Sequence, residues 1–495
     1  MGIADEFILR IREQLGHVPT ADQEHAMGVV SAFLMSRERS CMVMRGSAGT
    51  GKTTLASAVV RALRQSGHKL VLLAPTGRAA KVFTQHSGQP AYTIHRRIYR
   101  QKSTASLSAF ALNDNLYRDT LFIIDEASMI TAVGGDTTFG SGSVLSDLVN
   151  YVYSGSGCRM MLLGDTAQLP PVGEDEPMAL QAGVLQSLGL GVYECDLNEV
   201  LRQGQHSGIL WNATRLRQAV LQQGDGEAPL PVIRFTGFPD IVSVPGGELI
   251  EALASSYGRV GVDETMVVTR SNKRAVIYNR GIRNTVLDRE EELCRGDQLM
   301  IVKNNYFWLN ATLRDAEDKP TKESVFTLSF LANGDRCVVQ RVRHVRELYG
   351  LRFADVTLQL PDYPADGQDA VSGDAFELTA TVLLDTLTAE APALTSDQQS
   401  KLFENVMEDY ADIPLASDRM KALRNDPHYN ALQVKYGYAV TCHKAQGGQW
   451  AHVYIDQGYI SDDTTTSDYH HWLYTALTRA TEKVFLVNWP DNQRE

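Results

Sequence analysis

The chain has 495 residues, 43% of them hydrophobic and 21% charged, an average globular composition that excludes collagen-like, coiled-coil and wholly disordered proteins. The length predicts roughly three domains, and no apolar run approaches the ~18 residues of a membrane helix. The acidic start is no secretory signal and the six scattered cysteines form no CxxC pair, so we expect a cytoplasmic protein with reduced thiols and no membrane partner.

The first 200 residues repeat one rhythm, in which a short apolar run is followed by a turn of small or acidic residues and then by a helical pattern. This rhythm is typical of a parallel sheet. The expected strands are 41–44, 70–74, 121–124 and 160–163. Ligands of such sheets bind at the carboxyl ends of the strands, so the loops that follow them carry the candidate site.

The loop after the first strand, Gly46–Thr53, fits the phosphate-binding pattern GxxxxGK[ST] between a strand and a helix. Its glycines let backbone N–H groups turn toward phosphate, Lys52 reaches the β and γ oxygens, and Thr53 ligates Mg²⁺. The sequence therefore predicts ATP and Mg²⁺ as cofactors. The residues expected to contact the nucleotide in this loop are Gly46, Ser47, Ala48, Gly49, Thr50, Gly51, Lys52, Thr53 and Thr54.

The stretch 76–102 carries six basic residues and no Asp or Glu, and 269–283 carries five basic residues without an acid. The net charge of −12 taken alone argues against a nucleic-acid partner. However, most of the negative charge lies in residues 361–420, which hold 13 carboxylates against Lys401 and Arg419. The other residues are nearly neutral. The two basic stretches are interpreted either as phosphate-binding surfaces or as ordinary solvated faces.

Acidic and amide side chains follow the next two strands. Asp125 is placed to hold Mg²⁺ and Glu126 to polarise the attacking water, a division of labour that hydrolysis requires. Gln168 ends a later strand within reach of a γ-phosphate. Taken alone, the first pair would suit a helix N-terminus and Gln168 an ordinary turn.

The second half of the chain contains another α/β unit, interrupted by an insertion. Its expected strands are 266–269, 452–455 and 484–487. Residues 304–360 alternate apolar and polar positions around turns at Asn333-Gly334 and Tyr349-Gly350, which predicts a small antiparallel barrel or sheet. The acidic segment 361–420 is expected to be a linker with one helix near 398–410, and it either repels DNA or binds a basic partner.

Several further motifs, in this order, resemble those of superfamily 1 helicases of the 5′-to-3′ branch, the RecD-like and phage Dda-like motors. The early segments are PTADQ (19–23), APTGRAA (74–80), TIH (93–95) and LRQ (201–203). The late ones are YAVTCHKAQGG (438–448) and YTALTRA (474–480).

This resemblance implies an α/β fold of two RecA-like P-loop motor domains with parallel sheets, a small β-hairpin insertion in the first and a β-rich SH3-like barrel in the second. The implied domains are 1–200 with a strand-separating hairpin at 101–119, then 201–303 with 426–495, and the inserted 304–425. It also implies that Gln23 reads adenine and that Arg202 and Arg479 are arginine fingers. A guanidinium brought from a second domain stabilises the transferring phosphoryl group, so ATP binding would draw the two domains together.

The DNA track is expected to cross both motor domains on one face. The residues expected to contact DNA are Thr76, Arg78, His95, Arg96, Arg97, Phe110, Thr441, His443 and Gln446. Short polar side chains suit phosphates, the arginines add charge, and Phe110 is the candidate tip of the hairpin. For Tyr92, Tyr99 and the run 306–308, base stacking and a core role both remain open.

The leading hypothesis is an ATP-dependent helicase that moves 5′ to 3′ on single-stranded DNA and opens 5′-tailed duplex in replication, repair or recombination. A single-strand-binding protein is an expected partner. One alternative is a nucleotide-switched DNA-binding subunit of a larger complex, and another is an RNA helicase of the same superfamily, because the motifs do not report the 2′-hydroxyl.

Overall fold

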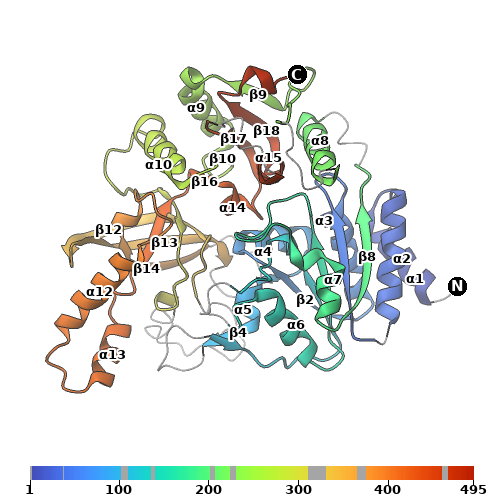
Figure 1. Cartoon of the computed structure of the whole chain (residues 1–495), viewed down its shortest axis with the longest axis horizontal. Helices are drawn as coiled ribbons and strands as arrows, with labels where there is room; N and C mark the ends of the chain where they lie inside the picture. The colour runs from blue at the N-terminus through green and yellow to red at the C-terminus, as the bar shows by residue number, and fades with distance from the viewer. Residues whose placement is uncertain are drawn as a thin grey trace.

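The computed structural model describes residues 3–36, 38–101, 110–134, 140–200, 207–222, 230–309, 330–364, 375–459 and 467–495. They build two parallel sheets and a closed barrel (Figure 1). We call residues 3–200 the first lobe, 207–297 with 437–495 the second lobe, and the part between them the barrel region. The predicted fold class is confirmed. Among the described helices, none combines the length and the apolar character that crossing a bilayer requires.

The first lobe is a six-stranded parallel sheet in the order β3-β2-β6-β7-β1-β8, with a hydrophobic core on each face. All four strands expected from the sequence are present. The strands are β1 (Ser40–Gly46), β2 (Lys69–Ala74), β3 (Ala91–Thr93), β6 (Thr120–Ile124), β7 (Arg159–Gly164) and β8 (Gly191–Leu197). The helices are α1 (Ile3–Leu15), α2 (Ala21–Met35), α3 (Lys52–Gln65), α4 (Gly77–Ser87), α5 (Ile94–Ile98), α6 (Val144–Ser154) and α7 (Ala182–Ser187).

The second lobe is a five-stranded parallel sheet in the order β16-β10-β17-β18-β9. Its strands are β9 (Ile241–Val244), β10 (Thr265–Thr269), β16 (Ala439–Thr441), β17 (Trp450–Asp456) and β18 (Ala480–Val487). Its helices are α8 (Gly208–Gln222), α9 (Leu249–Val260), α10 (Asn272–Gly281), α14 (Cys442–Ala445) and α15 (Ser467–Leu477). Figure 1 shows α14 on the side of this lobe that faces α4 of the first lobe.

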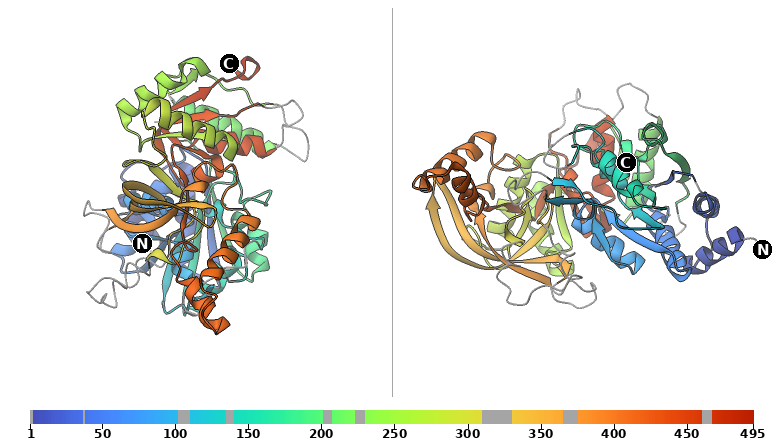
Figure 2. Two further views of the ribbon diagram at one scale, coloured as in Figure 1. Left: turned by 90° about the vertical axis from the view of Figure 1, so that its left-hand side faces the viewer. Right: turned by 90° about the horizontal axis from the view of Figure 1, so that it is seen from below.

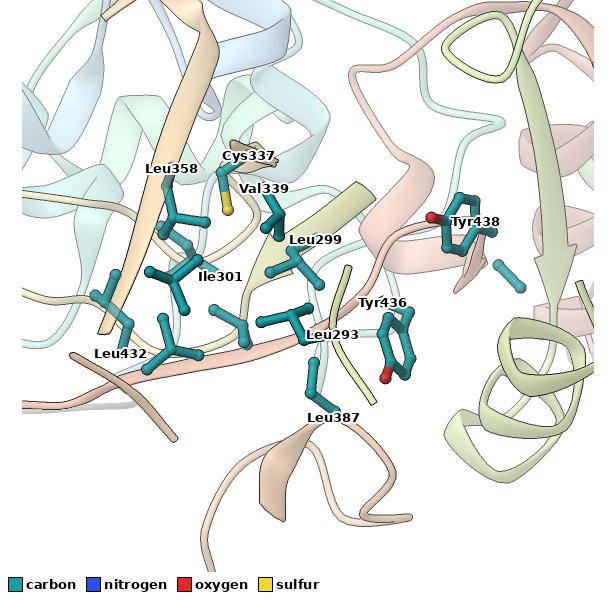
Figure 3. Close-up of a cluster of buried hydrophobic side chains, with 14 of the residues drawn as sticks. Leu293, Leu299, Ile301, Cys337, Val339, Leu358, Leu387, Leu432, Tyr436 and Tyr438 are labelled. Atoms are coloured by element: carbon teal, nitrogen blue, oxygen red, sulfur yellow. The ribbon is translucent and has the colours of Figure 1, made fainter. Parts of the chain in front are cut away.

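The barrel closes through five strands, of which only the β14–β15 pair is parallel. They are β11 (Gln298–Ile301), β12 (Arg336–Leu348), β13 (Leu351–Pro364), β14 (Ala375–Leu383) and β15 (Leu432–Tyr436). Its interior is filled by Leu, Ile, Val and Cys side chains, and the same cluster continues to Tyr436 and Tyr438 at the second lobe (Figure 3). The turn expected at Tyr349-Gly350 joins β12 to β13, with both residues at positive φ.

The structured barrel is wider than the sequence indicated. Strand β11 precedes the expected insertion 304–425 and β15 follows it, because the two short strands pair with each other and close the wall. The acidic segment 361–420 is also no linker where the structure describes it. It forms β14, α12 (Ser396–Asp409) and α13 (Ala416–Arg424), and the two helices pack on the far end of the barrel (Figure 2).

Asp297 lies where the second lobe passes into barrel strand β11. Its fully buried carboxylate accepts hydrogen bonds from Arg283 at 3.0 Å, from Arg289 at 2.6 Å and from the Tyr438 hydroxyl at 2.8 Å. Burial alone would raise the pKa of Asp297, but these donors outweigh it and hold the pKa below its ordinary value. Asp297 therefore remains a carboxylate between two cations.

Candidate functional site

The phosphate loop joins β1 to the N-terminus of α3. Gly49 and Gly51 have φ of +80° and +77°, a region that favours glycine. A Cβ on Gly46 would lie 2.9 Å from the Thr50 hydroxyl and 3.2 Å from Lys52, so the loop has room only for glycine there. Lys52 is the first residue of α3 and is 8% exposed. The loop thus has the shape expected of a phosphate loop at a helix N-terminus, where anions are favoured, and its binding of phosphate stays a prediction.

Gln23 lies directly behind this loop. Its side-chain N–H donates to the Thr50 carbonyl at 3.2 Å, and its oxygen accepts from the Thr20 N–H in a capping box at the start of α2. The predicted adenine-reading residue is therefore fully buried and braces the phosphate loop.

Asp125 and Glu126 follow β6. Burial, opposed by nearby Lys52, raises the pKa of Asp125 to about 6. Glu126 adopts a left-handed φ of +52°, which costs a residue with a Cβ about 1 to 2 kcal/mol. Its buried Oε2 has no hydrogen-bond partner among the described residues. These features suit a site that receives a cation and water, because hard oxygen donors are the ligands that Mg²⁺ prefers.

Gln168 lies in the loop after β7, where its buried Oε1 also lacks a hydrogen-bond partner within the described residues. The loop around it is held by α15 of the second lobe. The Leu169 N–H donates to the Thr475 hydroxyl at 2.8 Å, and His471 Nδ1 lies 2.9 Å from the Ala167 carbonyl. Gln168, the candidate γ-phosphate contact, therefore lies in a loop that is hydrogen-bonded to the second lobe. We call this contact region the joint between the lobes.

Tyr474 completes this joint. Its hydroxyl donates to the buried Asp165 carboxylate at 2.5 Å and accepts from the Ala48 N–H, inside the phosphate loop, at 3.0 Å. Burial raises the pKa of Tyr474 well above its ordinary value, so the hydroxyl stays protonated. Sequence reasoning missed the role of Tyr474, although it lies in the motif 474–480, and that of Asp165, which precedes Gln168 by three residues.

The two expected arginine fingers differ in what the structure describes. Arg479 is 3% exposed and donates to the Thr475 and Gly448 carbonyls and to the Thr478 hydroxyl, so its guanidinium is held within its own lobe. It follows α15, the helix that contacts the phosphate loop. Arg202 lies outside the described residues.

Three of the expected DNA contacts lie at the seam between the lobes. Thr76 caps α4, and a Cβ on Gly447 would come within 3.0 Å of its hydroxyl. The Arg78 guanidinium stacks over Trp450 at 4.2 Å and donates to the Gln449 carbonyl, and burial lowers its pKa to about 10. The Gln446 amide donates to the Leu169 carbonyl at 2.6 Å. Arg78 and Gln446 therefore join the lobes in this conformation, which sequence reasoning did not anticipate.

His95 opens onto a cavity of about 430 Å³ that is lined by residues of the first lobe and of the barrel region. Pro75 and Tyr99 of the first lobe and Asn304 of the barrel region share this lining. Burial lowers the pKa of His95 to about 4, so it is neutral near pH 7. We call this space the channel cavity. On the second lobe, His443 is exposed and Thr441 is half-buried.

The remaining expected contacts lie elsewhere. Arg96 and Arg97 turn away from the channel cavity into a separate one. Strands β4 (Tyr99–Gln101) and β5 (Phe110–Leu112) form the expected antiparallel hairpin, but its residues 102–109 and the Phe110 side chain lie outside the described part. Tyr99 is 6% exposed and donates to Asp147, which favours a core role.

One acidic side chain of the segment 361–420 links the barrel to the first lobe. Asp362 of β13 lies 3.4 Å from Lys81 of α4 and 3.8 Å from Arg336, and Lys81 also donates to the Pro361 carbonyl. Its carboxylate is 3% exposed. We call this contact the barrel latch.

Parts of the chain match known protein families and known proteins. Residues 20–229 match the model of an AAA domain, and 436–487 match that of a UvrD-like helicase C-terminal domain. The chain is 27% identical over 274 residues to an ATP-dependent RecD2 DNA helicase of Deinococcus radiodurans, covering 54% of this chain and 34% of that protein. It is 23% identical over 311 residues to the ATP-dependent DNA helicase dda of Enterobacteria phage T4, covering 62% and 65%. It thus spans less than two thirds of either relative.

Solved structures of Pif1 helicases also align with most of the chain. One from Bacteroides in complex with ADP-AlF3 and ssDNA has 14% identity and a TM-score of 0.44, covering 96% of this chain and 93% of that one. Another from Candida albicans has 16% identity and a TM-score of 0.44, covering 96% of each chain.

Proposed function

We propose, for a chain that is related to the superfamily 1 helicases of the RecD-like and Dda-like type, that it is an ATP-dependent DNA helicase that moves 5′ to 3′ along single-stranded DNA and unwinds duplex. The observation that carries the proposal is the joint at Tyr474. The Tyr474 hydroxyl links a phosphate-loop amide of the first lobe to helix α15 of the second lobe. A conformational change at the phosphate loop would therefore alter the contact between the two lobes.

The residues at the joint divide the work of hydrolysis. Lys52 and the loop amides bind the β- and γ-phosphates of ATP. Thr53 and Asp125 would hold Mg²⁺, which would supply positive charge to the phosphate oxygens. Glu126 accepts a proton from the attacking water. Gln168 contacts the γ-phosphate, and Arg202 and Arg479 supply positive charge from beyond the first lobe.

We place the proposed DNA path along the seam between the lobes and through the channel cavity. The cavity lies along the carboxyl-terminal side of the first sheet, beside the loops after β2 and β6, and the barrel region closes it at Asn304. Thr76 and Thr441 lie at the ends of β2 and β16, where short polar side chains suit backbone phosphates. A strand in this path would contact both lobes, so closure of the lobes would move it.

The test is hydrolysis and strand displacement by the purified chain. We expect oligo(dT) to stimulate phosphate release, and a duplex with a 5′ tail, not one with a 3′ tail, to be unwound. Hydrolysis that ignores single-stranded DNA contradicts the proposal. Strong hydrolysis without displacement would instead indicate a nucleotide-switched DNA-binding subunit, and preferential stimulation by oligo(rU) an RNA helicase.

A further inference from the structure

A second cavity in the first lobe, of about 300 Å³, lies beside the hairpin formed by β4 and β5. Its lining includes Tyr92, Arg96, Arg97, Leu116 and Tyr117. This volume is at the lower end of the range for ligand pockets, about 300 to 1,000 Å³, and suits a single nucleotide. Neither the nucleotide site nor the channel cavity uses any of these side chains.

The chemistry of this cavity suits a nucleotide. The Arg97 guanidinium lies over the Tyr92 ring at 4.7 Å and over the Tyr117 ring at 5.2 Å. Alternating guanidinium and aromatic planes are surfaces on which bases stack, and guanidinium groups also bind phosphate. Among the described lining residues, Asp114 is the one carboxylate, and it is paired with Arg100 at 3.1 Å, so this part of the lining has more basic than acidic side chains.

The position of the cavity is as informative as its chemistry. Helix α5 contributes His95 to the channel cavity and Arg96 and Arg97 to this one, and no described residue lines both cavities. Tyr99, at the start of the hairpin, lines the channel cavity, whereas residues 113–117, which leave the hairpin, line this one. The described base of the hairpin therefore borders both cavities.

We infer that the cavity of Tyr92, Arg97 and Tyr117 binds a nucleotide of the displaced strand, while the channel cavity takes the strand along which the protein moves. The inference rests on the proposed helicase function. If the hairpin divides a duplex, its strands must leave on different sides, and each side has a cavity with polar and aromatic groups. Arg96 and Arg97 are thereby assigned to the displaced strand and not to the tracking strand.

Photo-crosslinking without ATP tests the assignment directly. A forked DNA carries 4-thiothymidine at the first unpaired position of either the 3′ tail, which belongs to the displaced strand, or the 5′ tail. We expect the 3′-tail label to crosslink to peptides within 92–117 and the 5′-tail label not to do so. A 3′-tail label that reacts elsewhere, or a 5′-tail label that reacts there, overturns the inference. Because no unwinding is required, the result is separate from that of the helicase test.

Leu116→Glu provides a functional test at a position that is 87% exposed, so folding is not at stake. A carboxylate at the cavity should repel phosphate and reduce crosslinking of the 3′-tail label about fivefold. It should also abolish any preference for forked duplex over 5′-tailed duplex, while oligo(dT)-stimulated hydrolysis stays unchanged. Leu415→Glu, at a 63% exposed position in the barrel region, is the matched control and should change neither.

An unchanged 3′-tail crosslink in Leu116→Glu, or an equal loss of hydrolysis on oligo(dT), would contradict the assignment. Arg97→Gln gives a second measure, because loss of one stacked guanidinium should weaken the 3′-tail crosslink by about fivefold to tenfold. A crosslink of wild-type yield in Arg97→Gln would likewise overturn it.

Discussion

Lys52 is the positive charge closest to the predicted chemistry, since it begins α3 and lowers the pKa of neighbouring Asp125 against the effect of burial. Lys52→Ala is expected to reduce hydrolysis at least a hundredfold, because Lys52 is the basic side chain of the loop 46–53 and its charge is needed to stabilise the transferring phosphoryl oxygens. Phosphate release with saturating oligo(dT) measures this. Exposed Lys69→Ala is the control, and turnover in Lys52→Ala that matches this control would refute the site.

Tyr474→Phe removes one oxygen atom from the joint between the lobes. Ala48 N–H and Asp165 each lose a buried hydrogen-bond partner, at a cost of about 1 to 3 kcal/mol. We expect stimulation of hydrolysis by oligo(dT) to fall about tenfold, with a smaller change in hydrolysis without DNA. Steady-state hydrolysis with and without oligo(dT) separates the two effects. Tyr193→Phe, on half-buried β8, should leave both unchanged.

If Tyr474→Phe lowers hydrolysis with and without oligo(dT) by the same factor, the hydroxyl contributes to hydrolysis alone and does not couple DNA binding to it. A conformational role predicts that the ratio of the two rates changes, because only DNA binding has to be communicated through α15.

At the scale of elements, the N-terminus of α2 connects helix stability to the nucleotide site. Thr20 and Gln23 form a reciprocal capping box, and Gln23 also holds the Thr50 carbonyl. Thr20→Ala should destabilise this helix end by about 1 kcal/mol. Hydrogen exchange should accelerate about fivefold in the first turn of α2. Thr395→Ala, in the equivalent capping box of α12, should accelerate exchange there only, and an effect of Thr20→Ala on α12 would contradict a local role.

Elements with a local signature were predictable from the sequence, and elements made by distant pairing were not. Apolar runs and glycine spacing predicted β1, β6 and the phosphate loop because their geometry depends on neighbouring residues. The closure of β11 on β15 joins segments more than 130 residues apart, and each strand is too short to reveal its partner. The same holds for His471, Tyr474 and Thr475, whose partners lie about 300 or more residues away along the chain.

At the scale of the whole molecule, Asp297 holds together the junction at which the second lobe passes into barrel strand β11. Its folded pKa is depressed, so its contribution to stability is present above the pKa of the unfolded chain, about 3.9, and is lost as the pH falls through the folded value. Asp297→Asn should destabilise this junction by about 3 to 5 kcal/mol, because Arg283 is left as an unpaired buried cation.

Calorimetric unfolding of Asp297→Asn and wild type between pH 3 and 8 tests this. The difference between the two proteins should be constant near neutrality and should shrink below about pH 4. Asp491→Asn, whose side chain is 99% exposed, is the control with no expected effect. A difference that persists undiminished at pH 3 would show that the charge of Asp297 is not responsible.

The barrel wall continues into the second lobe almost without interruption. Strand β15 ends at Tyr436 and β16 begins at Ala439, and α14 and Gly447 follow within a few residues, with Gly447 against Thr76. At the other end, the barrel latch ties β13 to α4 of the first lobe. The barrel is thus joined to the second lobe through its own chain and to the first lobe through the barrel latch, so a displacement of α12 and α13 would be transmitted to both sides of the seam where Thr76 and Gly447 meet.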